Sequence, residues 1–367
     1  MNNRHIIQLD GLRFFAVIMV MIAHWLQWQW TNPILINIPF VHGVTLFFVL
    51  SGFLITQILL NNRDKYNENG FKKILLIKNF YIRRFFRIFP IYYLLIIGLF
   101  LFNYKNTREI FPWLVTYTSN IYQTINNVYI GDFNHFWSLA VEEQFYLFWP
   151  FVILFLKPNK TLLIIILTIV ISIITKSYLY VYVGKWMATS YFTLSCMHAL
   201  GLGALLAFIK TYKPKIENKL SSPVFLYLTF CLYVILLVGQ IKFSLGWYKE
   251  IFDDFFFALL AFFIILRASE NRFKGLFKII LENRFITYSG KISYGLYVFH
   301  LFIPTLFYYI APRIGLSISN KYTFFIAAYL LTFIVAHIAW KFIELPINKL
   351  KNRVPYMKSV HNTRYNQ

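Results

Sequence analysis

The stretch LDGLRFFAVIMVMIAHW, residues 9–25, is an apolar segment interrupted by Asp10, Arg13 and His24. A helix that crosses the hydrocarbon core of a bilayer needs about 20 consecutive, mainly apolar residues. An ionisable side chain within such a helix is costly unless it faces a protein interior or a water-filled cavity. The segment therefore predicts a first membrane-spanning helix with a polar stripe along one face.

Apolar segments of this kind recur along the whole chain, which is 59% hydrophobic and 21% aromatic. This composition is too apolar for a soluble domain, so the bilayer is the expected solvent. We expect an all-α membrane protein with one transmembrane domain over 1–347 and a short basic cytoplasmic tail over 348–367. The domain is expected to be a bundle of about ten transmembrane helices, near 12–30, 43–60, 88–103, 136–156, 161–183, 193–209, 223–241, 251–267, 289–311 and 323–343.

Charge predicts the orientation of these helices. If both termini are cytoplasmic, 26 of the 36 Lys and Arg residues fall in inside segments and seven in outside segments, which is the bias of membrane proteins. The first segment lacks a signal-peptide pattern, so we expect it to be retained. The localisation expected is the cell inner (plasma) membrane, which the chain crosses several times.

The net charge of +22 does not predict a nucleic-acid partner, because the basic residues lie between apolar segments instead of forming a solvated patch.

Metal and disulfide chemistry is not indicated. Cys196 and Cys231 both lie in apolar segments, and no histidine pair has the spacing of a zinc motif. We expect neither a metal site nor a permanently bound cofactor.

Arg13 and His24 are predicted to share one face of the first helix. Eleven helical positions leave them only ~20° apart around the axis and ~16 Å apart along it. Arg13 is then near the cytoplasmic mouth, with Asp10 as a possible ion partner, and His24 is deep. Each alone could serve helix packing, but together they indicate a functional track. A neutral imidazole accepts a proton from a hydroxyl, so His24 is a candidate general base.

A second basic motif, RRFFRIFP, starts at Arg83 and places Arg84 and Arg87 on one helical face at the cytoplasmic start of the third span. Planar guanidinium groups bind phosphate in a bidentate manner, so this pair is a candidate site for a phosphorylated ligand. The alternative is an ordinary positive flank of a membrane helix.

Two further segments supply candidate side chains. HFWSLAVEEQFYLFWP, residues 135–150, carries Glu142 and Glu143, one of which could orient His24, or both could belong to a structural ion-pair network. SYGLYVFHLFIP, residues 293–304, carries Gly295 and Pro304, which permit a break, and His300, which either lines the same cavity or makes a structural hydrogen bond. Candidate substrate-binding residues are Trp137, Ser138, Tyr294 and His300.

Three other features add expectations. Gly43, Ser51 and Gly52 in the second span favour close helix packing. The polar segment 104–135 is expected to contain a short interfacial or re-entrant helix over FPWLVTYTSNIYQ, and the segment could cover an acceptor site. Glu344, at the end of the last span, could pair with the arginines of the third span.

These motifs, in this order, resemble the acyltransferase family 3 of integral membrane O-acyltransferases over about residues 5–347. The segments that carry the resemblance are LDGLRFFAVIMVMIAH, FFVLSGFLIT, RRFFRIFP, FWSLAVEEQFYLFWP and SYGLYVFH. The resemblance implies transfer of an acyl group, commonly acetyl from cytoplasmic acetyl-CoA, to a hydroxyl of a cell-envelope carbohydrate such as lipopolysaccharide O-antigen or exopolysaccharide. Arg13 and His24 match the family's paired functional positions, and Arg84 and Arg87 match its second arginine motif. Some relatives carry an additional C-terminal hydrolase-like domain, which is not expected here.

The hypothesis that follows places the acyl-CoA phosphates at Arg84 and Arg87 and the thioester near His24, with the carbohydrate acceptor arriving from outside. His24 then removes the hydroxyl proton or first takes the acyl group as an acyl-imidazole, and the sequence leaves both routes open. The rival is a transporter or flippase of a lipid-linked sugar, which an absent inverted repeat and the position of the arginines disfavour. The other multispanning O-acyltransferase class is disfavoured because its upstream Asn is not evident.

Overall fold

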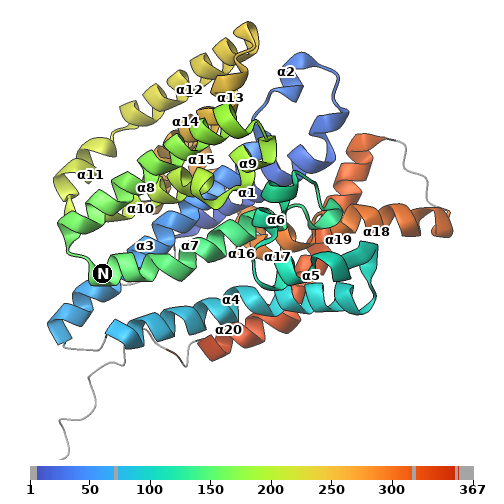
Figure 1. Cartoon of the computed structure of the whole chain (residues 1–367), viewed down its shortest axis with the longest axis horizontal. Helices are drawn as coiled ribbons and strands as arrows, with labels where there is room; N and C mark the ends of the chain where they lie inside the picture. The colour runs from blue at the N-terminus through green and yellow to red at the C-terminus, as the bar shows by residue number, and fades with distance from the viewer. Residues whose placement is uncertain (1–5, 70–72, 316–319, 352–353, 355–367) are drawn as a thin grey trace, which may run out of the picture.

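The computed structural model describes residues 6–69, 73–315, 320–351 and 354, and within these ranges the chain is helical with no strand. Figure 1 shows long helices running side by side across the molecule, with short helices gathered at their ends. The protein is therefore an all-α membrane protein, as the sequence predicts. The long helices are α1 (Ile7–Trp25), α3 (Gly43–Asn69), α4 (Lys73–Leu101), α7 (Phe136–Phe155), α8 (Pro158–Tyr178), α10 (Thr193–Tyr212), α12 (Pro223–Phe243), α14 (Asp253–Ser269) and α19 (Lys321–Ala339).

Eleven shorter α-helices connect or extend them in the described residues. They are α2 (Pro33–Ile36), α5 (Thr107–Val115), α6 (Ser119–Asn126), α9 (Trp186–Tyr191), α11 (Pro214–Leu220), α13 (Gly246–Ile251), α15 (Gly275–Leu281), α16 (Arg284–Lys291), α17 (Ser293–Phe299), α18 (Phe302–Ile310) and α20 (Leu345–Lys351). The helices α5 and α6 lie in the polar segment 104–135, so the expectation of a short helix there is confirmed.

The number of membrane crossings is close to the expected ten. Among the described residues, eight helices are long and apolar enough to cross a membrane, and the bent pair of α17 and α18, with an angle of 59°, brings the number to nine if it forms one broken span and not a re-entrant loop. The break that Gly295 and Pro304 suggested is thus present, between Phe299 and Phe302. The remaining predicted span, 251–267, corresponds to α14, whose 17 residues are at the lower limit for a crossing.

The third span differs from its predicted bounds. The sequence suggested a helix starting near residue 88, but α4 begins at Lys73 and has 29 residues. No Gly or Pro lies between Lys73 and Phe89, so no helix-breaking residue prevents α4 from beginning at Lys73. Arg84 and Arg87 consequently lie within the helix and not at its first turn.

Close packing of α3 against α10 forms the centre of the bundle. A Cβ atom added to Gly52 would overlap the carbonyl oxygen of Leu200, and one added to Gly203 would overlap the carbonyl oxygen of Val49. Small residues let two membrane helices approach until their backbones touch. The packing role expected for Gly43 also holds, because its Cα faces the carbonyl of Ala16 on α1.

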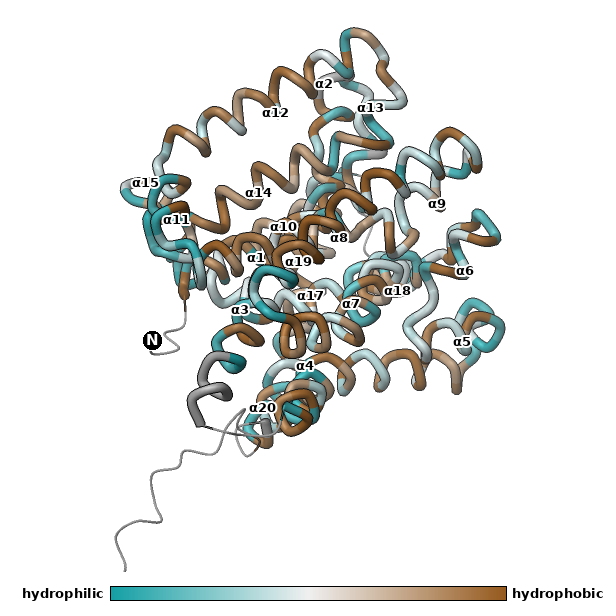
Figure 2. Tube along the Cα trace, turned by 60° about the vertical axis from the view of Figure 1, so that its left-hand side comes forward, coloured by the Kyte–Doolittle hydropathy of each residue, from teal (hydrophilic) through white to brown (hydrophobic). Residues whose placement is uncertain are grey.

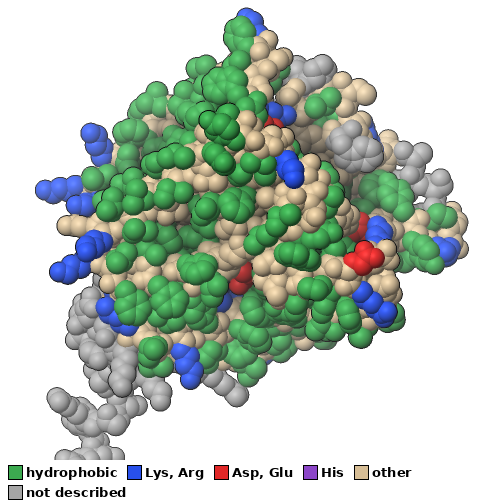
Figure 3. Space-filling model, in the orientation of Figure 1, with side chains coloured by type: hydrophobic (Ala, Val, Ile, Leu, Met, Phe, Trp, Pro, Cys, Tyr) green, Lys and Arg blue, Asp and Glu red, His purple; other side chains and the backbone are tan. Residues whose placement is uncertain are grey.

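The outer surface is apolar where lipid would contact it. Only 11% of the most apolar stretch of α12 is buried within the protein. Figure 2 shows this helix mainly in brown, the colour of hydrophobic residues. Figure 3 shows hydrophobic side chains spread over the face in view, with Lys and Arg projecting at the end where α11 lies. The exposed lysines Lys213, Lys215 and Lys219 belong to that end. These segments are the ones that the charge distribution assigns to the cytoplasm.

Candidate active site

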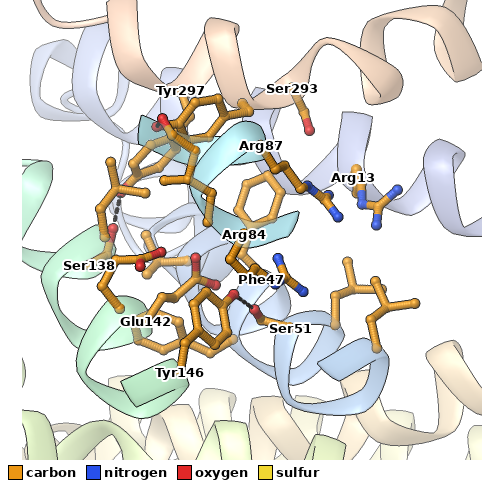
Figure 4. Close-up of a pocket in the computed structure, with 18 residues that line it drawn as sticks. Arg13, Phe47, Ser51, Arg84, Arg87, Ser138, Glu142, Tyr146, Ser293 and Tyr297 are labelled. Carbon is orange, nitrogen blue, oxygen red and sulfur yellow. Dashed lines mark hydrogen bonds between the residues drawn. The ribbon is translucent and has the colours of Figure 1, made fainter. Parts of the chain in front are cut away.

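Three arginines from two helices meet in one cavity within the bundle. Arg13 comes from α1, while Arg84 and Arg87 come from one face of α4. Figure 4 shows their guanidinium groups gathered on one side of the cavity. Its volume is about 110 Å³, and we call it the arginine cavity. The other polar side chains that line it are Ser51, Ser138, Glu142, Glu143, Tyr146, Ser293, Tyr294 and Tyr297.

Two of these arginines have no hydrogen-bond or ion-pair partner among the described residues. Arg13 Nη1 lies 2.6 Å from Asp10 Oδ1, so the ion pair expected one turn away is confirmed. The guanidinium of Arg84 instead lies over the ring of Tyr146, 4.7 Å from its centroid. Arg84 and Arg87 thus leave their N–H donors directed to the cavity, where an anion would satisfy them.

The opposite side of the arginine cavity carries acceptor groups from α7. Tyr146 and Ser51 share a hydrogen bond between their hydroxyls, and Glu142 lies next to this pair. The carboxylates of Glu142 and Glu143 partly balance the positive charge of the arginines across the cavity.

A second cavity, of about 360 Å³, continues from the arginine cavity toward the end of the bundle at which α1 begins. The two cavities share Arg13, Arg87, Ser293 and Tyr294. We call the second one the vestibule. Its additional charged residues are Asp10, Arg83, Lys291, Glu344 and Lys349, and Trp340 forms part of its side. Glu344 therefore lies beside Arg87, as the sequence suggested.

His24 lies in a different cavity, of about 340 Å³, near the other end of α1. We call it the histidine cavity. Trp137 and Tyr191 stack with ring centroids 4.4 Å apart on one side of it. Its charged residues and its histidines other than His24 are His42, Lys176, His198, Lys249, Glu250, Asp253 and Asp254.

The hydrogen-bond network assigns a tautomer to His24. Nδ1 of His300 lies 2.6 Å from the carbonyl oxygen of Tyr297, which only accepts, so this nitrogen carries a proton. In a neutral His300, Nε2 is then an acceptor, and it lies 2.8 Å from Nδ1 of His24. His24 Nδ1 therefore donates, which leaves the lone pair of a neutral His24 on Nε2. His300 acts as the orienting partner that the sequence analysis had sought in a glutamate.

Three side chains separate the two cavities. Val44 and Phe48 of α3 and Tyr297 of α17 line both the arginine cavity and the histidine cavity. The Tyr297 hydroxyl is held by Ser138 Oγ at 2.5 Å. We call these three residues the dividing wall. Arg13 and His24 both face the interior, as predicted, but the one cavity expected along their stripe is divided in two.

The predicted site residues are accordingly distributed between two places. Arg13, Arg84, Arg87, Glu142, Glu143, Ser138 and Tyr294 line the arginine cavity, while His24 and Trp137 line the histidine cavity. His300 is fully buried and contacts His24 directly. Neither Glu142 nor Glu143 lines the cavity that contains His24.

The amino-acid sequence matches the acyltransferase domain family over residues 6–341. The chain belongs to this family. It is 30% identical to the peptidoglycan O-acetyltransferase OatA of Listeria monocytogenes, over 99% of the present chain and 59% of that protein. It is also 30% identical to a putative O-acetyltransferase of one Staphylococcus aureus strain, over 94% of the chain and 58% of that protein. The identity to the O-acetyltransferase OatA of another Staphylococcus aureus strain is 30% as well, over 95% of the chain and 58% of that protein. The chain thus spans about three fifths of the length of the curated relatives it matches. No solved structure matches it.

Several residues of this acyltransferase domain were missed by the sequence analysis. Tyr146 was not distinguished from the other tyrosines of a chain that has 26. His42 and Asp253 were not connected, because 211 residues separate them. One signal was available: Lys176 and the adjacent acids Asp253 and Asp254 fall in predicted spans, where ionisable side chains indicate a site.

Proposed function

We propose that this chain is a membrane O-acetyltransferase that moves an acetyl group from acetyl-CoA to a hydroxyl of a cell-envelope carbohydrate. The observation that carries the proposal is the pair of cavities that meet at the dividing wall. One contains Arg84 and Arg87, which have no ion-pair partner among the described residues, and the other contains an oriented imidazole. The relatives that the chain matches are O-acetyltransferases by name, and they supply the reaction class.

The vestibule and the arginine cavity suit the donor. A CoA molecule carries several phosphate charges, and Arg84 and Arg87 offer donors that no described residue occupies. Arg83, Lys291 and Lys349 add positive charge to the vestibule along the same route. The acetyl thioester then reaches the dividing wall, between Arg13 and His24.

The histidine cavity suits the acceptor. His24 Nε2 removes the proton of the acceptor hydroxyl as its oxygen forms a bond with the thioester carbonyl carbon. The C–S bond breaks, and the thiolate leaves as CoA and takes up a proton. The alternative route, in which His24 first carries the acetyl group as an acyl-imidazole, uses the same nitrogen. Either route requires the side chains of the dividing wall to let the thioester and the imidazole meet.

The acceptor is proposed at the level of a cell-envelope glycan. The Listeria relative is named for peptidoglycan, so a peptidoglycan glycan strand is the first acceptor to test, ahead of lipopolysaccharide or exopolysaccharide. Because the chain covers about three fifths of that relative, completion of transfer by a separate partner is included in the proposal. The proposed location is the plasma membrane, with both termini in the cytoplasm.

The deciding experiment measures thiol release. Purified protein in detergent or nanodiscs is given acetyl-CoA with and without muramic-acid-containing glycan fragments, and free CoA and O-acetylated glycan are quantified. We expect glycan-dependent release of CoA that His24→Ala abolishes while insertion and thermal stability are unchanged. A transporter would release no CoA, and a correctly inserted His24→Ala protein with full transfer would contradict the role of His24.

A further inference from the structure

A cluster of ionisable side chains surrounds the start of α14 and lines the histidine cavity. His42 Nε2 lies 3.0 Å from Asp253 Oδ2, and Lys176 Nζ lies 2.6 Å from Asp254 Oδ2. His198 approaches the same carboxylate oxygen of Asp254 at 3.4 Å. These residues come from four separate elements, and all of them line the histidine cavity. The proton transfer proposed for His24 does not use them.

The pairs in this cluster leave acceptor capacity unused. Asp253 Oδ1 and Asp254 Oδ1 are buried, and neither accepts a hydrogen bond of normal geometry from the described residues, although the Tyr233 hydroxyl lies near Asp253. Asp253 as a whole is 7% exposed, while 22% of the Asp254 side chain remains accessible and lines the cavity. A buried carboxylate oxygen normally accepts a hydrogen bond. Because the terminal torsion of Asp is soft, either oxygen can turn to a hydroxyl group in the cavity.

Aromatic side chains line the same cavity as the acids. Trp137 and Tyr191 are stacked, and Trp186 meets the Tyr191 ring edge-on with centroids 5.2 Å apart. Trp186 itself is 42% exposed. Figure 1 places its helix, α9, at the same end of the molecule as α13. Aromatic faces carry partial negative charge and attract the polarised C–H bonds of a sugar ring.

The charge of this region selects against an anionic ligand. Asp253, Asp254 and Glu250 contribute three carboxylates to this cavity, against the two ammonium groups of Lys176 and Lys249. A carboxylate or phosphate would be repelled by the unsatisfied oxygens, whereas a hydroxyl would donate to them. An aromatic face next to unpaired acceptors is the combination that suits an uncharged, hydroxyl-rich ring.

We propose that the α14 end of the histidine cavity is a binding subsite for an uncharged sugar ring of the acceptor. Asp253 and Asp254 accept hydrogen bonds from its hydroxyls, and Trp186 packs against its C–H face. His42 and Lys176 hold the two carboxylates in place, so they are positioning residues. This inference rests on the proposed function, because it assumes that the acceptor enters this cavity.

The test compares two variants with one control. Asp253→Asn removes the charge of one acceptor, and Trp186→Ala removes an exposed ring with little structural cost. The control is Glu217→Gln, which alters the partly buried ion pair of Glu217 with Lys210, 2.6 Å apart. This pair lies outside the histidine cavity. The acceptor KM is measured at saturating acetyl-CoA, together with the slow hydrolysis of acetyl-CoA without acceptor and the thermal midpoint.

We expect both variants to raise the acceptor KM by about tenfold or more, since a hydrogen bond to a charged group or a stacking contact is lost. Acetyl-CoA hydrolysis and the KM for acetyl-CoA should stay within about twofold, as they should in Glu217→Gln. An unchanged acceptor KM in Trp186→Ala and Asp253→Asn, or an equal loss of hydrolysis and transfer, would overturn the subsite.

A binding measurement separates this inference from the proposed function. Quenching of tryptophan fluorescence is followed as N-acetylglucosamine oligomers, or oligomers of a uronic acid as the charged comparison, are added to purified protein. Trp186-dependent binding of the uncharged oligomer alone supports the subsite even if no acetyl transfer is observed. Transfer without such binding, or equal binding of both oligomers, contradicts it.

Discussion

At the scale of single residues, the pairing of two imidazoles determines what His24 can do. His300 fixes the proton of His24 on Nδ1 and turns Nε2 into the basic nitrogen. The Trp25 indole N–H donates to the His300 carbonyl at 3.1 Å, which anchors the same segment to α1. The orientation of the proposed base therefore depends on a residue 276 positions away in the chain.

Replacing His300 tests this orientation. We expect His300→Ala to lower kcat by about 100-fold, because a misoriented or wrongly protonated imidazole loses most of its general-base contribution. The acceptor KM should change little. His300→Gln, whose side-chain oxygen can still accept from His24 Nδ1, should recover part of the rate. His337→Ala, which removes a histidine bonded to Tyr288 instead, is the matched control.

The two unpaired arginines lead to a prediction about the donor. We expect Arg84→Ala with Arg87→Ala to weaken acetyl-CoA binding by at least about tenfold, measured by titration calorimetry. The double Lys variant keeps the charge but loses the planar donor geometry, so it should restore binding only partly. Retention of wild-type affinity in the double Ala protein would remove the arginine cavity from the donor site.

Helical periodicity placed some of the candidate site residues correctly on interior faces, while their roles stay predictions. Arg13, Arg84 and Arg87 were each assigned from helical periodicity, and the structure brings them into one cavity. The partner of His24 could not be assigned in this way, because the choice between Glu142 and His300 depends on how α7 and α17 are rotated against α1. Periodicity within one helix carries no information about its rotation relative to another.

At the scale of elements, glycine contacts decide which helices form the centre. α3 and α10 touch through Gly52 and Gly203, so neither position has room for a side chain. The sequence indicated the packing role of Gly52, but its partner helix was not predictable, since small residues occur in several spans. A break in this span was suggested by Gly295 and Pro304, and His300 was a candidate to line the cavity of His24, but the direct contact between the two imidazoles was not predictable.

Substitution of one of these glycines should destabilise the whole bundle. We expect Gly203→Val to lower the thermal midpoint in detergent by at least about 10 °C or to prevent accumulation of folded protein, because its side chain would collide with backbone atoms of α3. Gly239→Ala, on α12, meets nothing within 4 Å and should leave the midpoint unchanged or slightly higher. Equal midpoints for the two variants would contradict the close approach of α3 and α10.

At the scale of the whole molecule, charge and hydropathy made the architecture predictable, but they could not reveal the division into two cavities. The all-α bundle follows from apolar segments that recur along the chain. The dividing wall instead combines two residues of α3 with Tyr297 of α17, about 250 positions later. A partition of this kind exists only once the helices have packed.

Orientation in the membrane is the prediction that belongs to this scale. In a background without the native cysteines, Lys215→Cys on α11 and Asn126→Cys at the end of α6 place thiols at exposed positions. With both termini cytoplasmic, an impermeant maleimide added to intact cells should label Asn126→Cys and spare Lys215→Cys. Lysed cells serve as the control in which both react, and the opposite pattern on intact cells would invert the assigned topology.

The same side chains of the dividing wall line both cavities, and this arrangement has an electrical consequence. If water fills the cavities on both sides, the membrane potential drops mainly across Val44, Phe48 and Tyr297 and not across the full thickness of the bilayer. Moving one elementary charge through that drop is worth about 2.3 kcal/mol per 100 mV. A proton that passes from His24 to the departing thiolate would cross this short insulating layer, so the rate of the proposed transfer should respond to the voltage of an energised membrane.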